Sequence, residues 1–501
     1  MPRITVDDQT IEVPEGLTIL QALDAVGLLM NGVDIPHYCW HPKLSIDGSC
    51  RLCQVEVVGM PKLQIACNTL VADGMEIRTR TERVESAREG VMELLLVNHP
   101  LDCPICDQAG ECKLQDYAFE YGVSEARTRE PRRAAKKRVD LGPTIVFDQE
   151  RCILCRRCVR FCREVPGTGE LGVANRGDRS VIETFPGTRL ENDYSMNVAD
   201  ICPVGALTTK DFRFKIRVWF LEDVPGICTG CSNGCNVHLG VANNKVYRYV
   251  PRRNDAVNQT WICDAGRLSY KEIEGGRVRH ASVRAEGTAR EVAYGAAISE
   301  AAEQLRRVLE AKGPGAVGVL ASPHATNEDL LVLRRLLDAL KIDTRGFAVV
   351  RGHEDALPVK AEKAANAEVA RRLGFGAAAA VLDRVRQGAV EALLVLGHDA
   401  LASGALASPE ELAGLSALVL LDSHQSALQS VAHVVLPVRV AAEKRGTLTN
   451  ANGIVQAVEP AVEPAFEAWS EAEVLWRLGA LLGVSDFAGR FDPAAVAGAA
   501  R

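Results

Sequence analysis

The sequence has no apolar run of the ~20 residues that a membrane-spanning helix needs. It also lacks the glycine-rich motifs G-x-G-x-x-G and G-x-x-x-x-G-K-[ST], so no nucleotide site is indicated. A formal net charge of −7 argues against a nucleic-acid partner. The amino terminus enters a strand pattern at once, without a signal-peptide core or an Arg-rich transit segment. We therefore predict a cytoplasmic, bacterial protein that meets a membrane only through partner subunits.

Cysteine is absent after Cys263, whereas all 16 cysteines lie between Cys39 and that residue. A disulfide framework is a poor fit, because such frameworks belong to small domains in oxidising compartments. Clustered C-x2-C pairs in a chain of 501 residues instead indicate metal sites. The length predicts several domains, and the distribution of cysteines divides the chain into a cofactor-bearing front half and a cofactor-poor rear half.

One short stretch offers four soft metal ligands with the spacing H-x3-C-x2-C-x5-C, namely His99, Cys103, Cys106 and Cys112. Pro100, Pro104 and Gly110 keep this stretch from becoming a helix. An iron–sulfur cluster is one interpretation. A zinc knuckle is the alternative, because zinc also accepts three thiolates and one imidazole. Apolar residues at helical spacing over 82–97 predict a helix that delivers His99 to the site.

The first 70 residues carry the pattern of a β-grasp ferredoxin. Residues 3–6 and 10–13 predict a hairpin, and Thr18 with Gln21 forms a capping-box pattern at the start of a helix that Gly27 ends. Four cysteines follow with the spacing C-x10-C-x2-C-x13-C: Cys39, Cys50, Cys53 and Cys67. This is a variant of the plant-type [2Fe–2S] arrangement, with zinc as the alternative.

The next cysteines are typical of half of a bacterial two-cluster ferredoxin. The run contains Cys152, Cys155, Cys158 and Cys162, and Cys202-Pro203 comes much later. The fourth cysteine of C-x2-C-x2-C-x3-C ligates the other cluster in such proteins. With only one triplet present, Cys202 is expected as the fourth ligand of the first three cysteines. Cys162 is then left over as a buried or cluster-adjacent thiol.

A fourth set has the spacing C-x2-C-x3-C-x27-C and consists of Cys228, Cys231, Cys235 and Cys263. Two strands around an Asn243-Asn244 turn lie inside it. His238 falls in the first of these strands and is expected to be a surface or packing residue rather than a ligand.

A basic run over 127–138 is predicted to be a solvated linker or a docking face. The rear half has an α/β pattern. Apolar runs at 317–320, 393–396 and 419–421 alternate with helical stretches at about 291–310, 328–340 and 409–416. This alternation predicts a parallel sheet with helices on both faces.

Together these motifs closely resemble the large iron–sulfur subunit of NADH:quinone oxidoreductase, respiratory complex I, over residues 1–275. The fourth cysteine set and the rear half are similar to molybdopterin oxidoreductases, through the segments Ser322–Glu328 and Glu443–Asn450. The chain is shorter than most members of the family, so the resemblance implies a shortened rear domain. It implies five domains: a [2Fe–2S] ferredoxin-type β-grasp domain at 1–80, a His(Cys)3 [4Fe–4S] domain at 81–122, a ferredoxin-like [4Fe–4S] domain at 139–216, a small β-rich four-cysteine domain at 217–275 and a molybdopterin-oxidoreductase-like α/β domain at 276–501.

The resemblance also implies cofactors and partners. The set of Cys39 would hold [2Fe–2S], and the sets of His99, Cys152 and Cys228 would each hold [4Fe–4S]. Electrons would pass from a separate flavin and NADH-binding subunit through these clusters toward quinone. A small [2Fe–2S] subunit and quinone-side peripheral subunits are the further expected partners. No flavin and no molybdopterin is expected on this chain, and no catalytic acid, base or nucleophile. Many members lack the fourth set, so we expect that cluster to be structural.

Other classes of protein share parts of this pattern. A molybdopterin-dependent formate dehydrogenase chain has the same front arrangement, but no cysteine after Cys263 is available to ligate molybdenum. An [FeFe]-hydrogenase also needs later cysteines for its active-site cluster. A zinc-stapled scaffold would be colourless and would lack reducible signals.

Overall fold

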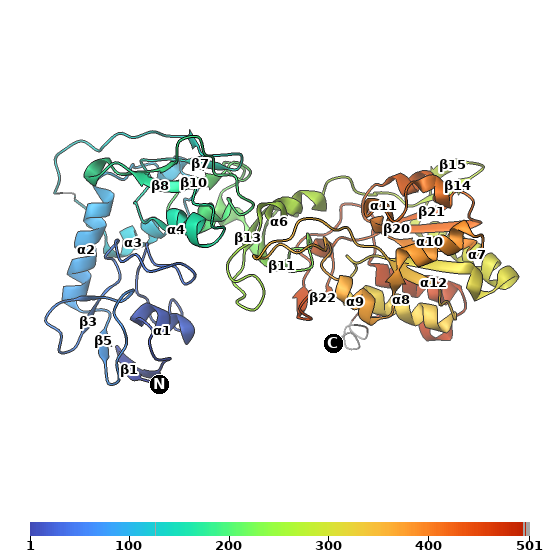
Figure 1. Ribbon diagram of the computed structural model, residues 1–501, viewed down its shortest axis with the longest axis horizontal. Helices are drawn as coiled ribbons and strands as arrows, with labels where there is room; N and C mark the ends of the chain where they lie inside the picture. The colour runs from blue at the N-terminus through green and yellow to red at the C-terminus, as the bar shows by residue number, and fades with distance from the viewer. Residues whose placement is uncertain (126, 494–495, 497–501) are drawn as a thin grey trace. The chain divides into compact units, whose positions relative to one another are not determined.

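A computed structural model describes residues 1–125, 127–493 and 496. The chain forms two compact units, Met1–Leu221 and Glu222–Arg501, called here the front unit and the rear unit. Each is described by itself, and Figure 1 labels many of its elements. Within the described residues, no helix is long and apolar enough to cross a membrane.

The front unit begins with a mixed five-stranded sheet of order β2-β1-β5-β3-β4. Its strands are β1 (Arg3–Val6), β2 (Gln9–Glu12), β3 (Gln54–Val57), β4 (Gln64–Ile65) and β5 (Glu76–Arg78). The helix α1 (Ile19–Ala25) buries Ile19, Leu20 and Leu23 in its core. Thr18 and Gln21 form the capping box at its start. The predicted hairpin, capping box and β-grasp fold are confirmed.

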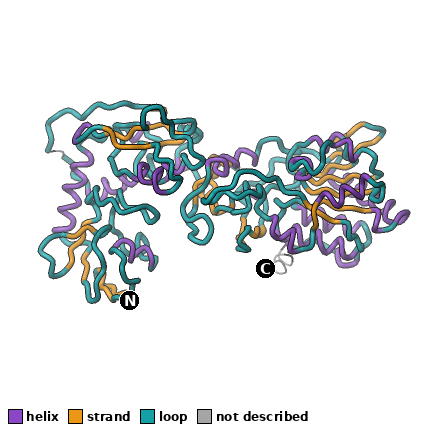
Figure 2. The backbone as a smooth tube through the Cα atoms, viewed as in Figure 1, coloured by secondary structure: helices purple, strands orange, loops and turns teal. Residues whose placement is uncertain are grey.

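The rest of the front unit is rich in loops between short elements (Figure 2). Its helices are α2 (Glu82–Leu96), α3 (Lys113–Tyr121), α4 (Arg157–Glu164) and α5 (Asn197–Asp200). Its strands are β6 (Val139–Asp140), β7 (Ile145–Phe147), β8 (Leu171–Ala174), β9 (Val181–Thr184) and β10 (Leu207–Thr209). The strands form a sheet of order β10-β7-β6 and a β8-β9 hairpin. The predicted helix before His99 is α2, which Thr81 caps by accepting from the N–H of Val84.

The rear unit begins with a small antiparallel sheet of order β11-β12-β13. Its strands are β11 (Glu222–Ile227), β12 (Asn236–Ala242) and β13 (Lys245–Pro251), and the short helix α6 (Asp264–Leu268) follows. Asn243 and Asn244 both have positive φ, as a two-residue hairpin turn requires. The hairpin predicted at these residues is confirmed.

An eight-stranded sheet of order β15-β14-β21-β20-β19-β16-β17-β18 organises the remainder. The six strands from β16 to β21 run parallel, and β14 joins β21 antiparallel. The strands are β14 (Ser282–Ala285), β15 (Thr288–Glu291), β16 (Val317–Ala321), β17 (Arg345–Phe347), β18 (Gly376–Ala377), β19 (Ala392–Leu396), β20 (Ala417–Asp422) and β21 (Val434–Pro437).

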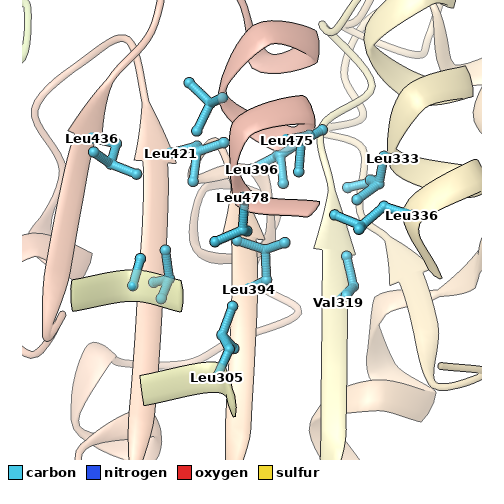
Figure 3. Packing of buried hydrophobic residues seen from close by; sticks show 14 of the residues in the cluster. Leu305, Val319, Leu333, Leu336, Leu394, Leu396, Leu421, Leu436, Leu475 and Leu478 are labelled. Carbon is cyan, nitrogen blue, oxygen red and sulfur yellow. The ribbon is translucent and has the colours of Figure 1, made fainter. Parts of the chain in front are cut away.

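Helices cover both faces of this sheet. They are α7 (Tyr294–Lys312), α8 (Asn327–Ala339), α9 (Ala367–Arg372), α10 (Ala378–Arg386), α11 (Asp399–Ala402) and α12 (Glu471–Leu481). Leu305, Leu333 and Leu475 pack against one face (Figure 3), whereas Val381 of α10 packs against the other. The predicted parallel sheet with helices on both faces is confirmed. The helix expected at about 409–416 is only a 3-10 helix, Pro409–Leu412, since the chain then turns toward β20.

The two segments that resemble molybdopterin oxidoreductases meet in a buried polar network. Lys444 donates to Asp329 at 2.8 Å and to Glu471 at 2.6 Å, and all three side chains are buried. Burial raises the pKa of Glu471 to about 7, and neighbouring Asp329 adds to the rise. Glu328 accepts from Thr447, which lies in the hairpin of β22 (Gly446–Thr449) and β23 (Val455–Val458). These polar motifs therefore hold the rear fold together.

Candidate metal centres

The first thiol set lies on the loops that flank β3 and β4 of the front unit. The thiols of Cys50 and Cys67 are hydrogen-bonded to Cys39, and Cys53 is hydrogen-bonded to Cys67. The backbone N–H groups of Ser49 and Cys50 also point at the Cys39 sulfur. These bonds, above all that from the Cys50 thiol, hold the pKa of Cys39 below its ordinary value. The same bonds, with burial, raise the pKa of the Cys50 and Cys67 thiols, so Cys39 is favoured as the thiolate over these two partners.

The ferredoxin-like set surrounds one cavity, which Cys152, Cys155, Cys158 and Cys202 line together. Leu154 adopts a left-handed backbone conformation, and its N–H lies 3.4 Å from the Cys152 sulfur. Burial raises the pKa of Cys202 to about 12, although backbone N–H groups oppose that shift. The structure thus places Cys202 beside the triplet. These four residues remain the predicted ligand set.

Cys162 is fully buried one helical turn after Cys158 on α4 and does not line this cavity. Burial, with neighbouring Glu170, raises the pKa of its thiol. Its placement agrees with the interpretation of a buried thiol beside the site.

The His99 set occupies the loop between α2 and α3. Cys106 and Cys112 are buried, whereas Cys103 is exposed. Burial lowers the pKa of His99 to about 4, so its imidazole is neutral at pH 7. Its Nδ1 atom is buried without a hydrogen-bond partner among the described residues. A buried imidazole with an unsatisfied nitrogen fits the role of a neutral metal ligand.

Gly205 links this set to the ferredoxin-like set. A Cβ atom at Gly205 would lie 2.2 Å from the Cys106 sulfur, so only glycine permits this approach. Two residues earlier, the carbonyl of Pro203 accepts from the N–H of Lys113 at 3.1 Å. The segment after Cys202 therefore packs directly against the His99 set.

Ionic and polar contacts fix the loop that carries the His99 set. Arg151 donates to Asp102 at 2.9 Å, and Lys137 bonds the same carboxylate. Arg217 donates to the carbonyl of Cys106 at 2.6 Å. Lys137 belongs to the basic run predicted to be a linker or docking face, so that run contributes at least one structural ion pair.

The fourth set belongs to the rear unit. The N–H of Cys228 donates to the carbonyl of Cys235 at 2.8 Å, which closes the loop that also carries Cys231. Cys263 caps α6, where its sulfur accepts from the N–H of Gly266 at 3.2 Å. A Cβ at Gly266 would lie 3.0 Å from the Cys228 sulfur and 3.2 Å from that of Cys263. The backbone of Gly266 thus lies against two sulfurs of the set.

His238 lies on β12, opposite Pro225 of β11 and Val250 of β13. Burial lowers its pKa. Its Nδ1 atom, like that of His99, is buried without a hydrogen-bond partner among the described residues, so a surface or packing role for His238 stays a prediction.

Sequence reasoning missed two arginines beside the thiol sets, Arg157 and Arg160 of α4. Arg160 donates to the backbone carbonyls of both Cys39 and Cys155. Arg157 donates to the carbonyls of Trp40 and Ile201. The available signal was the presence of arginines inside the run that carries the cysteine triplet.

The donor sets suit iron–sulfur clusters: soft thiolates, backbone N–H groups aimed at sulfur and one neutral imidazole. A zinc ion needs its ligands within about 2.3 Å of one point, whereas a cluster distributes its ligands over several irons. Iron, zinc and sulfide contents distinguish the two chemistries.

The fold and the thiol sets fit an iron–sulfur protein, and the families that match include both [2Fe–2S] and [4Fe–4S] cluster-binding domains. Five families match in chain order: "2Fe-2S iron-sulfur cluster binding domain" at 2–82, "NADH-ubiquinone oxidoreductase-G iron-sulfur binding region" at 88–127, "NADH-quinone oxidoreductase subunit 3, ferredoxin-like domain" at 142–208, "Molybdopterin oxidoreductase Fe4S4 domain" at 221–275 and "Molybdopterin oxidoreductase" at 351–480.

Several curated relatives share about two thirds of the chain. A subunit of the NADH-quinone oxidoreductase of Rickettsia bellii is 40% identical over 325 residues, which are 65% of this chain and 47% of that protein. The mitochondrial NADH dehydrogenase [ubiquinone] iron-sulfur protein 1 of Solanum tuberosum is 39% identical, over 67% of this chain and 44% of its own. The 75 kDa subunit of NADH-ubiquinone oxidoreductase of Reclinomonas americana is 39% identical, over 68% and 48%. The chain is homologous to this 75 kDa iron–sulfur subunit of NADH-quinone oxidoreductase, and the predicted resemblance is confirmed.

The chain spans about half the length of these relatives. A crystal structure of an NAD+-reducing [NiFe]-hydrogenase in the H2-reduced state also matches. It is 31% identical, with 43% of this chain and 91% of that chain covered, at a TM-score of 0.38.

Proposed function

We propose that this chain transfers electrons as the large iron–sulfur subunit of an NADH:quinone oxidoreductase. It would accept them from a flavin and NADH-binding subunit and pass them toward quinone, while proton translocation belongs to the whole complex. A small [2Fe–2S] subunit and quinone-side peripheral subunits complete the proposed partners, at the cytoplasmic face of the inner membrane. Homology to the 75 kDa subunit supports this role.

The proposed cofactors are one [2Fe–2S] cluster and two to three [4Fe–4S] clusters, each of which would change charge by one electron when bound. The proposed ligands of [2Fe–2S] are Cys39, Cys50, Cys53 and Cys67. Those of the first two [4Fe–4S] clusters are His99, Cys103, Cys106 and Cys112, and then Cys152, Cys155, Cys158 and Cys202. The ligands of the third would be Cys228, Cys231, Cys235 and Cys263. No flavin or molybdopterin is proposed on this chain.

One observation carries the proposal: short contacts connect three of the four sets within the front unit. Arg160 bonds the carbonyls of Cys39 and Cys155, so the first set adjoins the ferredoxin-like set. Gly205 then brings the chain that bears Cys202 against Cys106 of the His99 set. The residues therefore hold three candidate redox sites in a fixed order. Electron transfer needs such fixed spacing and no acid, base or nucleophile.

Iron and sulfide analysis tests the cofactors. Summed over the four sets, the proposed clusters give about 14 iron atoms per fully loaded chain. Protein prepared anaerobically should contain iron and acid-labile sulfide in this range, and NADH should reduce its clusters within the complex. Stoichiometric zinc with little sulfide would contradict the proposal.

His99→Cys tests the coordination of the imidazole. A thiolate in place of a neutral ligand makes the cluster more negative, so its midpoint potential should fall, on the order of 100 mV, while the [4Fe–4S] signal persists. Redox titration followed by electron paramagnetic resonance measures the change. The same substitution at His238, outside the thiol sets, should leave this potential unaltered. An unaltered potential in an assembled His99→Cys cluster would show that His99 is not a ligand.

A second candidate is the iron–sulfur chain of an NAD-linked formate dehydrogenase or hydrogenase. The matches to molybdopterin oxidoreductases at 221–275 and 351–480 favour it. Recovery of molybdopterin guanine dinucleotide from the native protein, or formate oxidation by it, would place this function first.

A further inference from the structure

Two arginines of α4 lie between the first thiol set and the ferredoxin-like set. Arg160 is 5% exposed, and its guanidinium donates to the carbonyls of Cys39, Ser45 and Cys155. Arg157, one turn earlier, is partly buried and donates to the carbonyls of Trp40 and Ile201. Each guanidinium therefore joins a loop of one site to a loop of the other.

Neither arginine has a carboxylate partner at ion-pair distance among the described residues. Glu164 is an electrostatic neighbour of Arg160, but its oxygens accept from the N–H and hydroxyl of Ser45. The flanking arginines of the same segment differ. Arg156 pairs with Asp47 at 2.7 Å, and Arg163 lies beside Glu164 at 3.4 Å. The positive charges of Arg157 and Arg160 must therefore be balanced by groups other than carboxylates.

The Nε atoms of Arg157 and Arg160 are buried and have no hydrogen-bond partner among the described residues. A buried charge is expensive unless it is paired and hydrogen-bonded. The thiolates of the two sets would supply negative charge beside both arginines, and Arg160 interacts electrostatically with Cys155. Arg157 interacts electrostatically with Cys39, Cys50, Cys155 and Cys202.

We infer that Arg157 and Arg160 form a cationic bridge between the two sites, which raises the potential of both clusters and fixes the distance between them. This inference rests on the proposed function. A fixed positive charge favours the reduced, more negative state of a cluster at either side. During transfer one electron leaves the donor site and one enters the acceptor site. No bond forms, and both guanidinium groups keep their protons. The arginines are positioning residues and do not themselves carry the electron.

The test uses the full chain, prepared anaerobically, with redox titrations followed by electron paramagnetic resonance. Arg160→Gln and Arg157→Gln should each lower the midpoint potential of both clusters. A tenfold shift in the ratio of reduced to oxidised cluster is the expected size, which equals about 59 mV for a one-electron couple. Arg160→Lys keeps the charge and should retain most of the wild-type potential. Arg163→Gln, on the same helix but largely exposed, is the matched control and should leave both potentials unaltered.

Each result bears on a separate claim. Absence of the two cluster signals from the wild-type chain would refute the proposed function itself. Assembled clusters with unaltered potentials in the glutamine variants would overturn the cationic bridge and leave the proposed function standing. An equal fall in Arg160→Lys and Arg160→Gln would also overturn it, because charge would then not be the cause. If Arg160→Gln does not assemble its clusters, the potentials of Arg157→Gln are the test. Unaltered potentials in that variant would overturn the cationic bridge.

Discussion

Cys263→Ser is expected to remove one [4Fe–4S] signal and to lower strongly the stability of the small β-domain at the start of the rear unit. Serine cannot supply the soft thiolate that the site needs. The free energy with which a structural metal binds such a site is also folding free energy, on the order of 10 kcal/mol in small zinc domains. Loss of the ligand should therefore reduce the melting temperature and the yield of assembled protein.

The reason lies in what the fourth set joins. Cys228, Cys231 and Cys235 lie between β11 and β12, whereas Cys263 begins α6 after the hairpin ends. A cluster here would tie the loop between β11 and β12 to the start of α6 within the rear unit. The three sets proposed for the electron route all belong to the front unit. We therefore expect quinone reduction per correctly assembled complex to stay near the wild-type value.

Cys162→Ser is the matched control, because it makes the same chemical change at a buried thiol that we do not assign as a ligand. It should retain every cluster signal. Turnover that collapses in Cys263→Ser, with the other three clusters present and reducible by NADH, would place the fourth cluster on the electron route.

Lys444→Met should lower the free energy of unfolding of the rear unit by about 3–5 kcal/mol, because it leaves two buried carboxylates without their cation. Lys444 lies between Asp329 of α8 and Glu471 of α12, and all three side chains are at least nine-tenths buried. Hydrogen exchange of α8 and α12 should accelerate most. Urea unfolding followed by tryptophan fluorescence measures the loss, since Trp469 and Trp476 lie beside or within α12.

Lys312→Met provides the comparison. Lys312 pairs with Glu391 at 3.0 Å, but both side chains are solvent-accessible, so the expected loss is below about 1 kcal/mol. Equal losses in the free energy of unfolding from the two substitutions would show that burial does not determine how strongly the Lys444 network stabilises the rear unit.

The sequence by itself determined the candidate ligands and most of the regular elements. Cluster ligation depends on residue type and local spacing, so the four candidate sets can be predicted without a structure. The capping box at Thr18, the Asn243-Asn244 hairpin and the buried strands of the rear sheet also carry local signals. These features follow from the preferences of neighbouring residues, which the chain order preserves.

Only the tertiary structure decided which distant groups meet. Arg160 reaches the carbonyl of Cys39 across 121 residues, and Lys444 reaches Asp329 across 115. In the sequence, Gly205 is an ordinary turn residue. The structure shows that the Cys106 sulfur lies against it. The stretch after Ser408 has helical periodicity but forms only Pro409–Leu412, because the entry into β20 limits its length. Long-range contacts leave no periodic trace in the sequence, since their energy depends on how the whole chain packs.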